Sequence, residues 1–184
     1  GIPALASCGW IGYPYYHREL LSLIRGASPS FRVALSQHAA VLLQARSGTG
    51  QHAIGTSILA YVGDERLVTH LGERLALNGL LEGYENHALL ALGTNRAGEL
   101  FANSARSTAS AIAAARGSDS TGAKSAELFY TISPRSADLR YLISVELERH
   151  ILGLIDDQDD NVSHIGVDIA VSSRAPTLLR HIVL

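Results

Sequence analysis

The fold depends on two stretches of the sequence, AAVLLQARSGTGQHA at residues 39–53 and HALLALGTNRAGE at residues 87–99. In each stretch an apolar run gives way to glycine and small polar residues, and a helical pattern follows. This order predicts a strand, a loop and the start of a helix. If the two strands are parallel, both loops meet at one edge of the sheet, where backbone N–H groups bind anions. The stretches therefore predict a crevice for a phosphorylated small molecule.

Strand and helix patterns alternate along the rest of the chain. This alternation predicts an α/β protein, a three-layer sandwich with a mainly parallel, Rossmann-like sheet. A chain of 184 residues is long enough to bury one full core, so we expect a single domain. Within it we expect an N-terminal arm and helices at residues 1–37, and a sugar-phosphate-binding α/β core at residues 38–184.

Individual elements follow from periodicity and from capping residues. Helices are predicted at 15–25, from Ser28 or Ser30 to 38, at 64–78, at 99–116 and at 175–184, and strands at 126–132 and 168–172. Residues 54–62 fit a helix or a strand. Residues 135–155 fit one helix, or a buried strand at 139–145 followed by a shorter helix.

Composition excludes several classes of protein. The formal net charge is −2, and the sequence does not contain the basic stripe that is typical of nucleic-acid-binding proteins. We therefore expect no nucleic acid partner. No apolar stretch approaches the roughly 18 residues that cross a bilayer, and the first residues do not resemble a signal peptide. We therefore expect a cytoplasmic protein without a membrane partner. Cys8 is the only cysteine, and the histidines do not show the paired spacing of metal ligands, so we expect no metal site. We also expect no cofactor.

Three segments resemble the sugar isomerase (SIS) domain family. Residues 48–53 (GTGQHA) are similar to its first sugar-phosphate loop, and residues 91–99 (ALGTNRAGE) to its second. Ser133-Pro134 with residues 137–139 (ADL) is similar to the segment after the next strand. The resemblance covers roughly residues 38–150.

Membership of that family implies carbohydrate binding, with a sugar phosphate as ligand. It also implies a Rossmann-like fold and assembly into dimers or tetramers, so we expect a homo-oligomer. On this resemblance and the loop pattern, the substrate-binding residues are Ser47, Thr49, Gly50, Gln51, Thr94, Asn95 and Gly98.

Two carboxylates are candidates for isomerase chemistry. An aldose–ketose isomerase needs one carboxylate to move a proton between C1 and C2, and an acid or imidazole to open the sugar ring. Glu146 or Glu148 is the candidate base, with His52 or His150 assisting as a further catalytic group. The competing interpretation is that Glu146 and His150, four residues apart on a helix, form a surface pair.

An acidic segment matches part of a calcium loop. Asp157, Asp159, Asn161 and Asp168 fall at positions 1, 3, 5 and 12 of such a loop. However, Val162 stands where the loop needs glycine for its sharp turn. An acidic surface turn is the competing interpretation.

A non-catalytic function is the alternative. Ala97 and Leu100 stand where the SIS family has serine and threonine, so two phosphate-binding hydroxyls are missing. This loss favours a metabolite sensor that does not turn over its ligand. Residues 4–16 also resemble a helix-turn-helix, which would instead indicate an all-α regulator.

Overall fold

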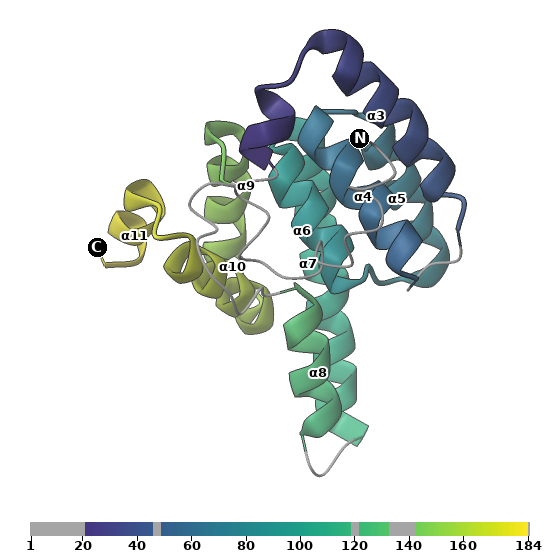
Figure 1. The fold of residues 1–184 in the computed structure, drawn as a ribbon. Helices are drawn as coiled ribbons and strands as arrows, with labels where there is room; N and C mark the ends of the chain where they lie inside the picture. Colours follow the sequence, from purple (N-terminus) through teal and green to yellow (C-terminus); the bar gives the residue numbers. More distant parts are fainter. Residues whose placement is uncertain (1–20, 46–48, 119–121, 133–142, 184) are drawn as a thin grey trace.

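The chain folds into helices alone over the residues that the structure describes. This computed structural model describes residues 21–45, 49–118, 122–132 and 143–183, and every regular element there is an α-helix (Figure 1). The prediction of an α/β sandwich with a Rossmann-like parallel sheet is therefore wrong, since these ranges contain no strand. The predicted α/β core at 38–184 is helical wherever it is described.

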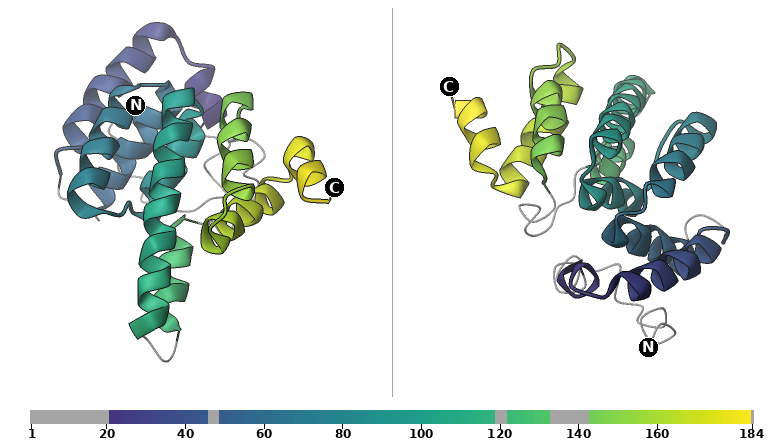
Figure 2. Two further views of the ribbon diagram at one scale, coloured as in Figure 1. Left: turned by 180° about the vertical axis from the view of Figure 1, so that it is seen from behind. Right: turned by 90° about the horizontal axis from the view of Figure 1, so that it is seen from above.

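The helices follow one another around an arc in sequence order, from α3 at one end to α11 at the other (Figure 2). Each packs mainly against helices close to it in sequence. Residues 21–25 are also helical. The later helices are α3 (Pro29–Leu42), α4 (Gly50–Val62), α5 (Arg66–Asn78), α6 (Gly83–Leu92), α7 (Asn95–Ser118), α8 (Ala123–Ile132), α9 (Val145–Ile155), α10 (Asp160–Ser173) and α11 (Pro176–Val183).

The first apolar run is helical because its buried positions recur every four residues. Leu35, Ala39 and Leu43 are buried, whereas Val41 between them is 64% exposed. This spacing belongs to one face of a helix, since a strand would bury alternate residues. The run therefore ends α3, and the loop after it joins two helices.

The second apolar run is helical although it shows no period. Residues 88–92 of α6 are all buried, because α4, α7 and α8 pack around this helix. A segment buried on every side loses the alternation that distinguishes helix from strand. Gly93 ends α6 in the left-handed conformation, with φ of 73°, and α7 starts two residues later.

Of the other predicted elements, several helices are confirmed and the strands are wrong. The helices predicted up to 38, at 64–78 and at 99–116 are confirmed as parts of α3, α5 and α7, and Ser28 is the N-cap of α3. The two other predicted strands are also wrong: 126–132 lies in α8 and 168–172 in α10. Residues 54–62, whose pattern fitted a helix or a strand, are helical as part of α4, and residues 145–155 form α9. Residues 1–20, which include the segment that resembles a helix-turn-helix, lie outside the described residues. So do residues 133–142, which include the third SIS-like segment.

Close packing of α3 on α4 depends on a glycine. A Cβ atom at Gly55 would lie 2.9 Å from both the Ala39 carbonyl oxygen and the Leu42 Cβ. Only glycine allows the two backbones to approach this closely. In the part of the chain that is described, no helix has the length and apolar character that a membrane crossing requires.

Candidate functional site

The two predicted anion-binding loops cap helices. The Thr49 hydroxyl accepts a hydrogen bond from the His52 amide at 3.4 Å, and the Thr94 hydroxyl accepts one from the Ala97 amide at 3.3 Å. Helix α4 packs on α3, α5 and α6, whereas α7 packs on α5, α6, α8, α9 and α10. The loops therefore start two helices of a stack and do not share the edge of a sheet. Ser47 lies outside the described residues.

The remaining predicted binding residues lie on the first turns of the same helices. Gly50 and Gln51 are exposed on α4. Asn95 Oδ1 accepts hydrogen bonds from Arg149 Nη2 and from His150 Nε2, the latter at 2.9 Å if that nitrogen carries the proton. Gly98 leaves room for the His150 ring, which a Cβ atom there would overlap. These contacts join α7 to α9, and binding by these residues stays a prediction.

The three predicted catalytic residues are divided between two helices. Glu146 is exposed on the first turn of α9, and Glu148 Oε2 accepts a hydrogen bond from the Thr177 hydroxyl at 2.8 Å. His52 is buried on α4, which packs on other helices than α9 does. The structure therefore does not bring the carboxylates and the imidazole together through any packed helix pair. Their catalytic roles remain untested predictions.

A buried polar cluster lies where α4, α5 and α6 meet. His52 is 1% exposed, its Nδ1 lies 2.9 Å from the Tyr84 hydroxyl, and its Nε2 lies 3.3 Å from His70 Nε2. The His52 and Tyr84 rings meet edge to face. One chain of hydrogen bonds thus connects the three helices.

A buried ion pair completes the cluster. Glu85 is fully buried, and its Oε1 lies 2.6 Å from Arg74 Nε and 3.9 Å from His52 Nδ1. Its other oxygen accepts a hydrogen bond from the Glu82 amide at 2.8 Å, as part of the capping box that starts α6. The carboxylate therefore caps a helix and also compensates the arginine.

Burial sets the ionisation of this cluster. It lowers the pKa of His52 to about 4, with smaller contributions from Arg74 and His70. Burial and Arg74 also lower the pKa of His70. For Glu85, burial raises the pKa and outweighs the opposing hydrogen bonds and the attraction of Arg74. Both imidazoles are thus neutral at pH 7, and each has one N–H to donate.

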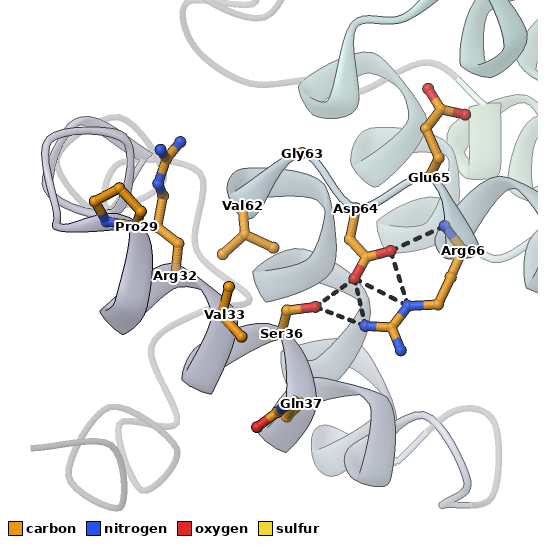
Figure 3. Close-up of a pocket in the computed structure, with 10 residues that line it drawn as sticks. All are labelled: Pro29, Arg32, Val33, Ser36, Gln37, Val62, Gly63, Asp64, Glu65 and Arg66. Atoms are coloured by element: carbon orange, nitrogen blue, oxygen red, sulfur yellow. Dashed lines mark hydrogen bonds and ion pairs between the residues drawn. The ribbon is translucent and has the colours of Figure 1, made fainter.

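An open groove lies between α3 and the turn that joins α4 to α5 (Figure 3). Its volume of about 630 Å³ is in the range of small-molecule sites. Pro29, Val33 and Val62 supply apolar atoms. The full lining is Pro29, Arg32, Val33, Ser36, Gln37, Val62, Gly63, Asp64, Glu65 and Arg66. We call this feature the α3 groove.

A network of three side chains occupies one part of the α3 groove. Arg66 Nη2 donates to Asp64 Oδ2 at 2.6 Å and to the Ser36 hydroxyl at 2.7 Å, and that hydroxyl donates to Asp64. The hydrogen bonds from Arg66 are the main cause that lowers the pKa of Asp64 to about 2. This carboxylate is therefore ionised and compensated at neutral pH.

Two side chains of the groove have a polar atom that is shielded from solvent and makes no hydrogen bond among the described residues. These atoms are Arg32 Nε and Glu65 Oε2. Glu65 Oε2 lies 3.7 Å from Arg96 Nη1, which is an ion-pair distance but too long for a hydrogen bond. In Figure 3, Arg32 and Glu65 lie on opposite sides of Val33 and Val62. The groove thus offers the Arg32 Nε donor, which has no acceptor in the described part of the chain, beside apolar side chains.

No metal site is formed by the residues with a described placement, where no group of three metal-binding side chains occurs. The calcium-loop pattern falls on a helix: Asp159 caps α10, and Asn161 and Asp168 belong to that helix. Asp157 pairs with Arg106 at 3.1 Å. An extended 12-residue loop is therefore absent from this segment.

Comparisons of the chain with models of protein families, with curated proteins and with solved structures found no match. The resemblance to SIS domains stays a prediction from the sequence, and the Rossmann-like fold that it implied is contradicted by the helices. Sequence reasoning missed His70, Arg74, Tyr84 and Glu85. A usable signal was the pair Glu82 and Glu85, three residues apart before an apolar run.

Proposed function

We propose that this chain is a non-catalytic, all-α regulatory domain that binds an anionic ligand in the α3 groove. The arc of helices supports this proposal, because stacked helices present extended surfaces to ligands and partners. The phosphosugar isomerase interpretation relied on a sheet edge and loses that support.

The unsatisfied Arg32 donor carries the proposal. A buried donor without an acceptor costs about 1–3 kcal/mol. A carboxylate or phosphate on the ligand would remove that cost with a charge-assisted hydrogen bond. The neighbouring apolar atoms of Val33 and Val62 would cover the body of the ligand.

A regulatory function without catalysis fits the position of the buried polar cluster. Its imidazoles and carboxylate are the groups best suited to acid–base chemistry, yet they are hydrogen-bonded to one another inside the core. None of the residues that line the α3 groove belongs to this cluster. A ligand in the groove would therefore contact none of these groups, and the Asp64 carboxylate, whose pKa is low, is already compensated by Arg66.

The test is a fragment screen on ¹⁵N-labelled full chain, using small carboxylates, small phosphates and matched neutral amides. We expect the anionic fragments to shift the amide signals of Val33, Ser36 and Gly63, and the neutral amides to shift none. Arg32→Ala should weaken the anions by roughly tenfold, the loss of one charge-assisted hydrogen bond. Arg180→Ala, on the distant α11, is the matched control and should change nothing. Shifts that map away from the groove, or equal binding to Arg32→Ala, would reject the proposal.

A further inference from the structure

The four charged side chains of the α3 groove fall into two sets. Asp64 and Arg66 compensate each other, with Oδ2 and Nη2 2.6 Å apart. Arg32 Nε and Glu65 Oε2, by contrast, are both shielded from solvent and make no hydrogen bond among the described residues. The groove therefore has one cationic donor and one anionic acceptor whose hydrogen-bonding capacity the described chain does not use.

Glu65 keeps this capacity although a cation lies near it. Arg96 Nη1 is 3.7 Å from Glu65 Oε2, too long for a hydrogen bond, and the Arg96 side chain is 64% exposed. Water screens such a contact, so it compensates little of the carboxylate charge. The Glu65 side chain is itself 40% exposed, and the torsion of a carboxylate is soft, so Oε2 can turn towards a ligand. An anion bound at Arg32 would leave this acceptor as it is.

Apolar side chains separate the two groups. Arg32 lies on α3 and Glu65 is the N-cap of α5, and Figure 3 shows them on opposite sides of Val33 and Val62. Val33 is 57% exposed, and Pro29 adds further apolar atoms to the same lining. A matching ligand therefore carries an anion at one end, a cation at the other end, and an apolar chain between them.

We propose that the α3 groove binds a linear zwitterion, a small molecule in which an apolar chain joins a carboxylate to an ammonium group. This inference rests on the proposed function and adds a positive end to the anionic ligand. The carboxylate accepts hydrogen bonds from Arg32, and the ammonium donates to Glu65. The chain between them lies on Val33 and Val62. Both polar contacts are charge-assisted, and each satisfies an atom that makes no hydrogen bond within the described chain.

The test is a series of ω-amino acids of increasing length, 4-aminobutanoate, 6-aminohexanoate and 8-aminooctanoate, titrated into the ¹⁵N-labelled full chain. Each is compared with the alkanoate of the same length, which lacks the ammonium, and with the alkylamine, which lacks the carboxylate. We expect at least one ω-amino acid to bind roughly fivefold more tightly than its alkanoate, the gain of one partly exposed ion pair. This gain should depend on chain length, because the two ends of the site are fixed in space.

Two variants that remove charge but keep the shape of the side chain assign the two ends. Glu65→Gln should abolish the gain and leave alkanoate binding unchanged. Arg32→Gln should weaken the ω-amino acid and the alkanoate alike, by roughly tenfold. Glu127→Gln, at an exposed carboxylate on α8, is the matched control and should change neither affinity.

The outcomes separate this proposal from the proposed function. If alkanoates bind at Arg32 but no ω-amino acid binds more tightly than its alkanoate, or if Glu65→Gln leaves the gain unchanged, the zwitterion proposal fails and the proposed function stands. If neither alkanoates nor ω-amino acids bind in a way that depends on Arg32, both fail. Alkylamines that bind more tightly than alkanoates would overturn both in favour of a cationic ligand at Glu65.

Discussion

Two arginine–carboxylate pairs in this protein have the same nitrogen–oxygen distance, but the pKa of the carboxyl group is raised in one pair and lowered in the other. Arg74 and Glu85 in the buried polar cluster, and Arg66 and Asp64 in the α3 groove, each have nitrogen and oxygen 2.6 Å apart. Burial raises the pKa of Glu85, while hydrogen bonds from Arg66 lower that of Asp64 to about 2. The Arg66 and Asp64 side chains are 62% and 15% exposed, whereas those of Arg74 and Glu85 are 19% and 0% exposed. Distance alone therefore does not define an ion pair; the solvent around it decides which ionisation state is favoured.

The comparison predicts its largest effect for the buried pair. Glu85→Ala should lower the free energy of unfolding by about 3–5 kcal/mol, because it removes the buried carboxylate that pairs with Arg74 and breaks the capping box. Urea denaturation measures this. Glu146→Ala, at an exposed carboxylate, is the control and should stay within about 0.5 kcal/mol. The double variant Glu85→Leu with Arg74→Met should recover part of the loss. A loss below about 1 kcal/mol for Glu85→Ala would contradict the importance given to burial.

The second effect is a dependence of stability on pH at His52. Its pKa is about 4 in the folded chain and about 6.5 when unfolded. Below pH 6.5 the unfolded state therefore binds more protons, so stability is present above pH 6.5 and is lost as the pH falls towards 4. Between pH 7 and pH 4.5 this residue should contribute a loss of roughly 2 kcal/mol.

This contribution is measured as the difference in pH profile between the wild type and His52→Asn. The difference is needed because the raised pKa of Glu85 acts in the opposite direction: its uptake of a proton in the folded state favours folding at low pH. Val145→Ala, at an exposed residue that does not titrate, is the control and should keep the wild-type profile. Parallel profiles for the wild type and His52→Asn would show that His52 is not held neutral by the core.

The third effect concerns the exposed pair and should be smaller. Asp64→Asn should cost about 1 kcal/mol or less, because water screens Arg66. In the wild type this contribution is present above the ordinary pKa of aspartate, near 3.8, and is lost as the pH falls towards 2. Denaturation at pH 7 and at pH 2.5 tests both statements. A cost as large as that of Glu85→Ala would break the comparison.

The smallest effect is that of salt. Raising NaCl from 0.1 M to 1 M should weaken the coupling between Arg66 and Asp64 by less than about 0.5 kcal/mol and leave that between Arg74 and Glu85 unchanged. Double-mutant cycles at the two salt concentrations measure both couplings. An equal response of the two pairs would show that solvent reaches the buried polar cluster.

The sequence predicted α5 and the start of α3 well, because their period or their capping residue can be recognised locally. Helix α5 alternates buried Leu67 and Leu71 with charged residues and ends at Gly79, whose φ is 75°, so both its period and its end were readable. Ser28 likewise marked the start of α3, since its hydroxyl accepts the Phe31 amide. Prediction failed at the end of α3 and in α6, α8 and α10, where strands were expected. In α6, residues 88–92 are all apolar and all buried, so no period remains in that run.

The candidate site was harder to predict than the fold. The small hydroxylated residues Thr49 and Thr94 were read as ligand-binding, yet both cap helices, and a cap and an anion-binding loop use the same residue types. Arg32 was missed because nothing local in the sequence shows which arginine has a donor without an acceptor among the described residues. That property depends on the positions of Ser36, Asp64 and Arg66 in space.

By itself the sequence determined the helical periods with an exposed side, their capping residues, and a composition without a basic stripe. These are local properties, decided by residues within four positions of one another. Only the tertiary structure decided that the unbroken apolar runs are helices, that His52, His70 and Glu85 meet in the core, and that Arg32 Nε has no acceptor among the residues the structure describes. These are contacts between residues distant in the chain, and the burial that sets their energies exists only once the helices have packed.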